Sequence, residues 1–531
     1  MTQARRMTEA LGRTEALGRT EALGMTTGMV YLVGAGPGDP GLLTLRGGEL
    51  LVTCDAIVYD ALANPALLAL ASVHERATPV ELHDVGKRGG ASESARQDEI
   101  NALLVRLGKE GKRVVRLKGG DPLVFGRGSE EAQALAEAGV PFEIVPGVTA
   151  GIAAAAYAGI PVTHRGIATS VTFVTGHEDP AKDTTTVDWS ALARAGGTIV
   201  LYMGVKTLPR IAAALVGGGM SPETPAAAVQ WGTHPHQRTV TGTLSTLADV
   251  MEREGISAPV ITIIGPVVAL REEIGWFDRR PLFGKRIVVT RARSQAASLS
   301  ERLRAAGAEV IEMPATQIEV ADPGPLRSAI ARRDEYGWIM FTSQNAVRIF
   351  WDALRAESLD ARALARVKIG AVGPATAAAL LDCGIAVDVS PDRFVAEALL
   401  DALRDRRDVR GVRVLYAAAQ GARETLQDGL EELGAVVDRV ELYRSVPDGA
   451  GSEELRARLL DGGADLVTFT SASSVKAFVA AVGDDAAVRV RAASIGPITS
   501  AAAREHGLEV AIEATESTIP GLVAAITAQF A

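Results

Sequence analysis

The chain has 531 residues, of which 47% are hydrophobic and only 4% aromatic, and its formal net charge at pH 7 is −9. This length predicts more than one domain, and the abundance of small apolar residues favours layered α/β domains over all-β ones. The acidic balance argues against nucleic acid as a partner, and no apolar run reaches the roughly 18 residues that cross a membrane. The two distant cysteines, Cys54 and Cys383, fit a cytoplasmic protein without a disulfide framework or a thiolate metal site.

Residues 8–24 repeat the motif Thr-Glu-Ala-Leu-Gly-Arg almost perfectly. The period of this repeat matches neither an α-helix nor a coiled-coil heptad, and every unit carries a glycine that weakens a helix. The segment also lacks the apolar core of a signal peptide. We therefore expect residues 1–28 to form a disordered tail, or to lie upstream of a true start at Met25 or Met29.

From residue 29 onward, short apolar strands alternate with helical segments, a pattern typical of βαβ units and a parallel sheet. An alanine-rich segment, 149–158, follows Pro146 and Gly147, and this change of character predicts two lobes that meet near residue 147. The predicted helices are 42–52, 98–107 and 129–138, and the predicted strands are 29–33, 56–59, 113–117, 142–145, 170–175, 198–203, 226–230 and 260–264.

The most informative stretch is 116–131, Arg-Leu-Lys-Gly-Gly-Asp-Pro-Leu-Val-Phe-Gly-Arg-Gly-Ser-Glu-Glu, which begins where a predicted strand ends. Parallel sheets bind ligands at this edge. Gly119 and Gly120 let the main chain approach a ligand, and Asp121 adds a carboxylate acceptor. The same stretch carries the cations Arg116, Lys118 and Arg127. A pocket lined by main chain beside a cationic rim suits a small polar cofactor next to an acidic substrate.

A second glycine-rich loop, Gly34–Gly41, follows the first predicted strand. It is not a dinucleotide fingerprint, because Asp39 stands where the last glycine is required and Pro37 removes an amide that a pyrophosphate would use. Its pairing with residues 118–128 strengthens the prediction of a cofactor pocket.

Several charged side chains outside these loops are candidates for chemistry. Asp60 ends the strand 56–59, and Lys87 lies with Arg88 in a flexible basic turn; from the residues alone they are either an acid–base pair or solvated charges. His234 and His236 have the spacing of metal ligands, but no third ligand is near them in the sequence. We interpret them as loop residues and expect no metal.

Residues 274–283 are predicted to be a linker, and the half that follows contains an internal repeat. The segment 341–347 resembles 469–475, and the Gly-Pro-x-Thr turn of 372–376 resembles that of 495–499. Hydroxyls and amides at strand-to-helix turns either cap helices or bind anions. Four such turns in matched pairs favour a cleft lined by neutral donors.

Residues 29–273 resemble uroporphyrinogen-III C-methyltransferases of the tetrapyrrole methylase family. The motifs that carry the resemblance are 34–41, 59–60, 85–88, 97–101, 115–128, 145–150, 156–165, 170–177, 201–204 and 265–271. The resemblance implies a two-lobed α/β domain that uses S-adenosylmethionine to convert uroporphyrinogen III into precorrin-2. It places the cofactor between the lobes, against Pro37, Gly119, Gly120, Asp121, Val124, Thr149, Ala150, Met203 and Gly232.

The same resemblance assigns roles to charged residues. It implies that Asp60 is the proton acceptor and Lys87 the proton donor. Because uroporphyrinogen III is a polycarboxylate, the cations around the pocket would bind it: Arg88, Arg116, Lys118, Arg127 and Arg165.

Residues 284–531 resemble uroporphyrinogen-III synthase through the paired turns and residues 440–443. The resemblance implies a second two-lobed α/β domain, with lobes 284–319 plus 446–531 and 320–445, that cyclises hydroxymethylbilane. Tyr443 aligns with a proposed general acid of that family, although packing alone also explains a tyrosine here. Substrate carboxylates would be held by Thr342, Ser343, Thr376, Thr470, Ser471 and Thr499.

Two functional hypotheses follow. The first is a bifunctional enzyme that makes uroporphyrinogen III and methylates it. The second is a methyltransferase whose C-terminal half is a non-catalytic tetrapyrrole-binding or regulatory module. In either case the resemblance implies a homodimer formed through the methylase domain, and the sequence leaves siroheme or cobalamin open as the destination.

Overall fold

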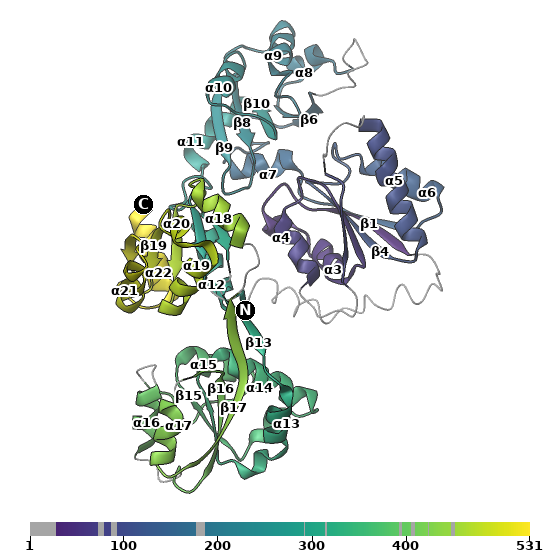
Figure 1. The fold of residues 1–531 in the computed structure, drawn as a ribbon. Helices are drawn as coiled ribbons and strands as arrows, with labels where there is room; N and C mark the ends of the chain where they lie inside the picture. Colours follow the sequence, from purple (N-terminus) through teal and green to yellow (C-terminus); the bar gives the residue numbers. More distant parts are fainter. Residues whose placement is uncertain are drawn as a thin grey trace. The chain divides into compact units, whose positions relative to one another are not determined.

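The structure is a computed structural model. It describes residues 28–72, 79–86, 93–176, 186–290, 293–313, 316–391, 396–404, 409–422, 424–447 and 452–530. The N-terminal repeat lies outside these residues, so the disordered tail stays a prediction. The chain divides close to residue 287 into two compact units, with residues 297–310 and 523–531 grouped with the first unit. Its strands form four five-stranded sheets (Figure 1).

The first sheet has the strand order β3-β2-β4-β1-β5, and every pair in it is parallel. Its strands are β1 (Met29–Gly34), β2 (Ala56–Tyr59), β3 (Glu81–Asp84), β4 (Arg113–Lys118) and β5 (Phe142–Val145). The helical segments that connect them are η1 (Pro40–Leu42), α3 (Leu45–Thr53), α4 (Pro65–Leu68), η2 (Ala69–Ser72), α5 (Glu93–Lys109) and α6 (Gly128–Glu137).

The central strand β4 is covered on both faces. Successive side chains of a strand point to opposite faces. Val114 therefore packs in the cluster that includes Leu104 and Leu135 of α5 and α6, whereas Val115 packs with Leu50 of α3. Helices on both faces bury the whole strand, as expected for a parallel sheet, so any charged residue on β4 requires a buried partner.

The second sheet has the order β6-β7-β10-β8-β9 and is mixed, because only β6 and β7 pair in parallel. Its strands are β6 (Val171–Thr175), β7 (Thr198–Tyr202), β8 (Pro225–Gln230), β9 (Arg238–Thr243) and β10 (Val260–Ile264). The accompanying helices are α7 (Ala150–Tyr157), α8 (Trp189–Ala195), α9 (Leu208–Gly217), α10 (Leu247–Arg253), η3 (Pro266–Leu270) and α11 (Arg271–Ile274).

The third sheet has the order β12-β11-β18-β19-β20, and its pairs β18–β19 and β19–β20 are parallel. Its strands are β11 (Arg286–Val289), β12 (Glu309–Glu312), β18 (Leu466–Phe469), β19 (Arg491–Ser494) and β20 (Val510–Glu513). Its helices are α12 (Arg293–Ala305), α18 (Ser452–Leu460), α19 (Ala472–Val482), α20 (Asp484–Ala487), α21 (Pro497–Glu505) and α22 (Ile519–Phe530).

The fourth sheet has the order β13-β17-β16-β14-β15, and the long strand β17 joins antiparallel β13 to parallel β16. Its strands are β13 (Thr316–Val320), β14 (Trp338–Phe341), β15 (Lys368–Ala371), β16 (Arg413–Ala419) and β17 (Val436–Pro447). Its helical segments are α13 (Pro323–Ala331), η4 (Arg333–Glu335), α14 (Gln344–Ala356), η5 (Ala361–Leu364), α15 (Pro374–Asp382), α16 (Ala396–Arg404) and α17 (Thr425–Glu432).

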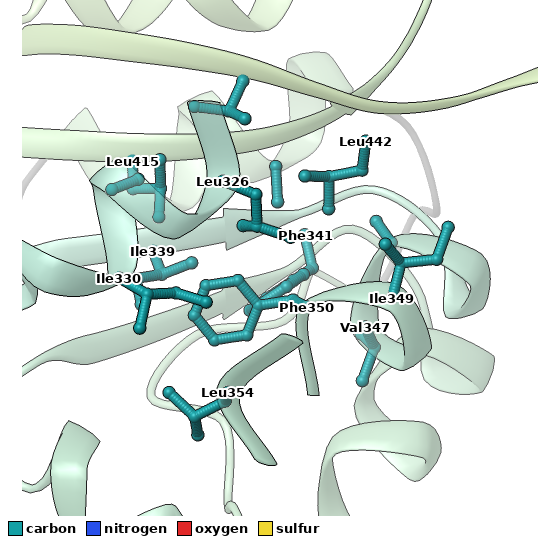
Figure 2. Close-up of a cluster of buried hydrophobic side chains, with 14 of the residues drawn as sticks. Leu326, Ile330, Ile339, Phe341, Val347, Ile349, Phe350, Leu354, Leu415 and Leu442 are labelled. Atoms are coloured by element: carbon teal, nitrogen blue, oxygen red, sulfur yellow. The ribbon is translucent and has the colours of Figure 1, made fainter. Parts of the chain in front are cut away.

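The core of the fourth sheet shows why its strands and helices hold together. Figure 2 shows Phe341 of β14 and Phe350 of α14 among buried aliphatic side chains, and their rings meet edge to face with centroids 5.4 Å apart. Leu326 and Ile330, one turn apart on α13, reach the same cluster. Apolar residues at this spacing lie on one face of the helix, and that face packs against the sheet.

The internal repeat is visible in the backbone. Strand β14 leads through Ser343 into α14, and β18 leads through Ser471 into α19; each serine accepts a hydrogen bond from a backbone N–H of its helix. In the second pair of turns, the helices end at Gly384 and Gly507, with φ of +80° and +77°. A left-handed glycine ends a helix by turning the chain away. Among the described residues, no helix combines the length and apolar character needed to cross a bilayer.

Candidate functional site

Three glycine turns meet main chain to main chain at the carboxyl edge of the first sheet. Gly36 and Gly120 exchange two backbone hydrogen bonds of 3.2 and 2.8 Å. A Cβ on Gly34 would lie 2.5 Å from the Cα of Gly147, and a Cβ on Gly147 would lie 2.3 Å from the carbonyl oxygen of Gly120. Such distances exclude any side chain, so the loops after β1, β4 and β5 present bare backbone where parallel sheets bind ligands.

Asp121 ties two of these loops together. Its Oδ2 accepts a 3.0 Å hydrogen bond from Gly147 N, and its Oδ1 accepts one of 2.8 Å from Leu123 N. Both carboxylate oxygens are therefore occupied by backbone donors. The predicted cofactor residue thus also fixes the shape of the loops that flank Gly119 and Gly120.

The second lobe contributes the start of α7 and the end of β7. Thr149 precedes Ala150, the first residue of α7, and its Oγ1 lies 2.7 Å from the hydroxyl of Tyr202. That hydroxyl also accepts a 2.7 Å hydrogen bond from Gly151 N, and burial raises the pKa of Tyr202. The start of α7 is thus anchored on the strand that leads to Met203.

Residues with a left-handed backbone gather around the predicted cofactor contacts. Six described non-glycine residues have positive φ, and five of them belong to residues 29–273. Non-glycine residues seldom adopt this conformation, and it persists where the surrounding structure imposes it, often at functional sites. The five are Phe125 and Arg127 after Val124, Met203 itself, and Trp231 and Thr233 on either side of Gly232.

Asp39 joins the loop after β1 to the second lobe. Its backbone N–H donates to Thr233 Oγ1 at 2.9 Å, and its Oδ2 accepts a 2.7 Å hydrogen bond from the hydroxyl of Tyr157 on α7. Burial and this hydrogen bond raise the pKa of Tyr157. The neighbour of Pro37 on this loop is therefore held from two elements of the other lobe.

The predicted linker packs on the same helix. The Tyr157 ring lies with its centroid 5.2 Å from that of Trp276 and 4.6 Å from that of Phe277, and Trp276 Nε1 donates to Ala156 O at 3.0 Å. Arg271 donates to Ala158 O and pairs with Asp278. Residues 276–278 are thus part of the packing around α7 rather than a bare tether.

Asp60 lies beside a buried group of charges. Arg116 Nη2 donates to Asp60 Oδ1 at 2.6 Å, and both Arg116 and Lys118 contact Glu131. The side chains of Arg116 and Lys118 are only 2% and 4% exposed. The prediction that these two cations line an open rim is therefore wrong, because they occupy the covered face of β4.

The remaining predicted cations differ in their surroundings. Arg127 is exposed and forms a bidentate pair with Glu130 at 2.8 and 2.7 Å. Arg165 lies exposed in the turn between His164 and Ala168. Lys87 and Arg88 lie outside the described residues, so their predicted roles stay predictions.

Glu131 is the charged residue that sequence reasoning missed. It is fully buried on the first turn of α6, and Gln97 of α5 also approaches it. A signal was present: Arg116 and Lys118 are two residues apart on a central strand, so they share a face that helices cover. Two buried cations require a buried carboxylate, and α6 is the helix that follows β4.

The histidine pair forms part of a loop, as interpreted from the sequence. The rings of His234 and His236 stand 5.0 Å apart, and both lie against Trp231. Burial lowers the pKa of His234 to about 4, which keeps its ring neutral near pH 7. Within the described ranges, no group of three His, Cys, Asp or Glu side chains is arranged to hold a metal ion.

In the second half, the structure brings Ser343 and Tyr443 together. The two hydroxyls are 2.8 Å apart, and Ser343 Oγ also accepts the 3.1 Å hydrogen bond that begins α14. Tyr443 is only 6% exposed, in the core of the fourth sheet. Thr342 bonds to Tyr416, whose pKa burial raises. The Ser343–Tyr443 pair places a phenol at the turn predicted to bind substrate.

Two of the predicted substrate-binding hydroxyls are buried. Thr376 is 4% exposed and Thr499 is 5% exposed. Each lies on the helix face that, four residues later, carries the buried Leu380 or Ala503. The prediction that their hydroxyls hold substrate carboxylates is therefore wrong in this structure. Thr342, Ser343, Thr470 and Ser471 remain partly exposed at their turns.

Family models match both halves of the chain. The model described as Tetrapyrrole (Corrin/Porphyrin) Methylases matches residues 29–248, and the model described as Uroporphyrinogen-III synthase HemD matches residues 297–524. The porphyrin biosynthesis protein HemD of Ruminiclostridium josui is 39% identical over 497 residues, which cover 93% of this chain and 97% of that protein. The chain belongs to the family of fused tetrapyrrole methylases and HemD-type uroporphyrinogen-III synthases.

Relatives that match a shorter part of this fusion have a higher identity over that part. The uroporphyrinogen-III C-methyltransferase of Bacillus subtilis is 44% identical over 338 residues, which cover 64% of this chain and 68% of that protein. The S-adenosyl-L-methionine-dependent uroporphyrinogen III methyltransferase of Methanosarcina barkeri is 50% identical over 248 residues, covering 47% of this chain and 95% of that protein. The glycine turns and five of the six described left-handed non-glycine residues lie within residues 29–248, which match the tetrapyrrole methylase model.

Proposed function

We propose that this fused protein cyclises hydroxymethylbilane to uroporphyrinogen III in its C-terminal half and methylates that product to precorrin-2 in its N-terminal half. The observation that carries the proposal is the meeting of three glycine turns, with no side chain between them, in the half that resembles uroporphyrinogen-III methyltransferases. The same chain continues into a half that matches the HemD synthase model.

The residues of the first half fit S-adenosylmethionine. A zwitterionic nucleoside donor offers many polar atoms, which backbone N–H and C=O groups bind without selecting a charge. The turns at Gly36, Gly120 and Gly147 pack against one another without side chains, and a Cβ on Gly120 would make only ordinary contact with Ala150 N, at 3.7 Å. We assign the donor to the neighbourhood of these turns, with Pro37, Met203 and Gly232 at its borders.

The chemistry asked of the chain is alignment and proton handling. S-adenosylmethionine supplies an electrophilic methyl group, which an electron-rich ring carbon of the substrate attacks. In this proposal the chain holds the two partners in line, and Asp60, whose side chain is 30% exposed, accepts the proton that the methylated ring system gives up. In this proposal the exposed Arg165, and Arg127 together with its partner Glu130, face the carboxylates of the substrate.

For the second half, we propose that the hydroxyls at the two serine turns orient a flexible linear substrate. Loss of its hydroxymethyl oxygen needs little assistance, so the task of the protein is to favour one ring closure. The 2.8 Å contact between Ser343 and Tyr443 supports a role for this phenol as the proton donor to the leaving oxygen. Thr342, Thr470 and Ser471 would bind carboxylates.

One incubation tests both activities. The full chain is supplied with hydroxymethylbilane and S-adenosylmethionine, and products are separated by isomer and followed by mass. We expect dimethylated isomer III. Unmethylated isomer III would refute the methylase assignment, and isomer I alone would refute the synthase assignment. Isomer I with methylation of externally added uroporphyrinogen III would support the non-catalytic module instead.

A further inference from the structure

A four-charge cluster lies behind Asp60. It consists of Asp60, Arg116, Lys118 and Glu131. The Glu131 side chain is fully buried and those of Arg116 and Lys118 almost so, whereas the Asp60 side chain is 30% exposed. Asp60 is thus the member of this cluster that a substrate in the candidate site can reach.

The cluster is organised around one oxygen of Glu131. Its Oε1 accepts hydrogen bonds from Arg116 Nε at 3.1 Å, Lys118 Nζ at 3.0 Å and Gln97 Nε2 at 3.4 Å. Arg116 then donates through Nη2 to Asp60 Oδ1 at 2.6 Å, and Lys118 Nζ lies 3.9 Å from Asp60 Oδ2. Both cations therefore stand between the two carboxylates.

Burying these four charges costs free energy unless opposite charges pair with each other. Removing an ion from water carries a penalty of several kcal/mol, which paired opposite charges offset only with good geometry. The cluster holds two cations and two carboxylates, and Glu131 Oε2 is buried without a hydrogen-bond partner among the described residues. Glu131 is therefore held through Oε1, by the two cations and Gln97, and in turn it neutralises part of the charge of the cations.

Lys118 responds to this environment. Its pKa is lowered by burial and by Arg116, while Glu131 and Asp60 act in the opposite direction. Glu130, which precedes Glu131 on α6, also interacts with Lys118 electrostatically. Asp60 and Glu131 therefore influence each other through the two cations between them.

Resting on the proposed methylase function, we propose that Glu131 is a positioning residue that keeps Asp60 an effective base. By neutralising part of the positive charge behind Asp60, it weakens the attraction that the two cations exert on the Asp60 carboxylate. Through Arg116 it also fixes the direction of that carboxylate. No atom of Glu131 needs to touch the substrate for either effect.

The test is the pH dependence of methylation of added uroporphyrinogen III by full-length protein. In Glu131→Gln, no second carboxylate offsets the two cations beside Asp60. We therefore expect the acidic limb of the kcat/KM profile to shift to lower pH by about one pH unit. The kcat at pH 8 should fall about tenfold, because a weaker base accepts the proton less readily. KM and the affinity for S-adenosylhomocysteine should stay unchanged.

Two further variants make the test specific. Lys118→Met removes a cation instead of a carboxylate and should shift the acidic limb of the kcat/KM profile to higher pH. The double variant E131Q/K118M restores the balance and should return the limb toward that of the wild type, an outcome that a purely structural role for Glu131 does not produce. Glu110→Gln, an exposed carboxylate of the same lobe that pairs with Lys112, is the matched control and should shift nothing.

The outcomes separate this inference from the function on which it rests. Wild-type protein that binds S-adenosylhomocysteine but methylates nothing would overturn the proposed function and the inference together. An active wild type with an unshifted limb in E131Q would overturn the inference alone. If E131Q does not fold, the direction of the K118M shift decides: a limb that stays in place or moves downward refutes the role of the cluster.

Discussion

Gly232 stands where the chain leaves no space for a side chain. A Cβ there would lie 2.4 Å from the Cβ of Ala154 on α7, closer than two carbon atoms can approach. A larger residue must push α7 away from the loop that carries Trp231 and Thr233, whose backbones are already left-handed. We place the methyl donor beside this close contact, so a displaced α7 would disturb its site.

Gly232→Ala should therefore weaken binding of S-adenosylhomocysteine at least tenfold, or about 1.4 kcal/mol. Isothermal titration calorimetry on the full chain measures this affinity. Gly217→Ala is the matched control, because nothing lies within 4 Å of a Cβ at Gly217. Equal affinity in the two variants would contradict the placement of the donor beside Gly232.

The phenol of Tyr443 can be removed without disturbing its ring. Tyr443→Phe keeps the buried packing and loses only the contact with Ser343, so stability should fall by about 1 kcal/mol or less. Formation of uroporphyrinogen III should fall about tenfold if this hydroxyl protonates the leaving oxygen. Isomer-resolved chromatography of the products measures the rate.

The control for this variant is Tyr336→Phe. Tyr336 lies in the same sheet unit, its hydroxyl donates to Asp438 at 2.8 Å, and burial raises its pKa to about 12. We expect its loss to leave the rate of ring closure unchanged. A Y443F enzyme as fast as Y336F would mean that Tyr443 serves packing alone.

At the level of single residues, the sequence predicted which turns meet at the sheet edge better than which side chains are accessible there. Glycine positions follow from backbone geometry, so Gly119 and Gly120 could be placed at a loop from local sequence. Exposure depends on which face a neighbouring helix covers. Arg116 and Thr376 are buried because each lies on a covered face. Recognising this from the sequence requires the side-chain periodicity of the strand or helix to assign every residue to a face.

Among the elements, the segment after α11 was predicted to be a linker, but it also packs against α7. Trp276 and Phe277 hold the ring of Tyr157, and the hydroxyl of Tyr157 holds Asp39 in the loop beside Pro37. A segment beyond the last helix of the second sheet thus supports a loop of the first sheet through a single side chain.

Tyr157→Phe should separate these two contacts, because the ring remains and the hydrogen bond to Asp39 is lost. We expect the affinity for S-adenosylhomocysteine to fall roughly fivefold, corresponding to about 1 kcal/mol for one hydrogen bond to a carboxylate. Calorimetry measures the affinity, and thermal unfolding shows whether the ring packing survives. An unchanged affinity would show that Asp39 keeps its position without Tyr157.

The sequence located buried strands well and exposed ones poorly. Strands β2 and β10, which are mostly buried, have the bounds predicted from their apolar residues, and so does the edge strand β5. Strands β3 and β9 were missed, and both are edge strands of their sheets. The residues of β3 are mostly exposed, and those of β9 are all exposed or intermediate, so neither carries the apolar pattern on which a strand prediction depends.

For the whole molecule, each sheet draws its strands from one half of the chain. Sheets one and two use strands between residues 29 and 264, and sheets three and four use strands between residues 286 and 513. The described catalytic candidates also belong to the sheets of their own half, since Asp60 follows β2 and Tyr443 lies in β17. Variants in one site should therefore leave the chemistry of the other intact.

Gly232→Ala should form uroporphyrinogen III at the rate of the wild type, and Tyr443→Phe should methylate added uroporphyrinogen III at the rate of the wild type. Separate assays with hydroxymethylbilane alone, and with uroporphyrinogen III plus S-adenosylmethionine, measure the two rates. A tenfold loss of the second activity in either variant would show that the sites depend on each other.

The paired hydrogen bonds between Gly36 and Gly120 join two loops through the backbone of the chain itself, so we expect these loops to be preorganised for binding. Binding then does not have to spend free energy on ordering these loops. The amide protons of Gly36 and Gly120 should consequently exchange slowly with deuterated solvent even in the empty protein, and adding S-adenosylhomocysteine should slow them only slightly further.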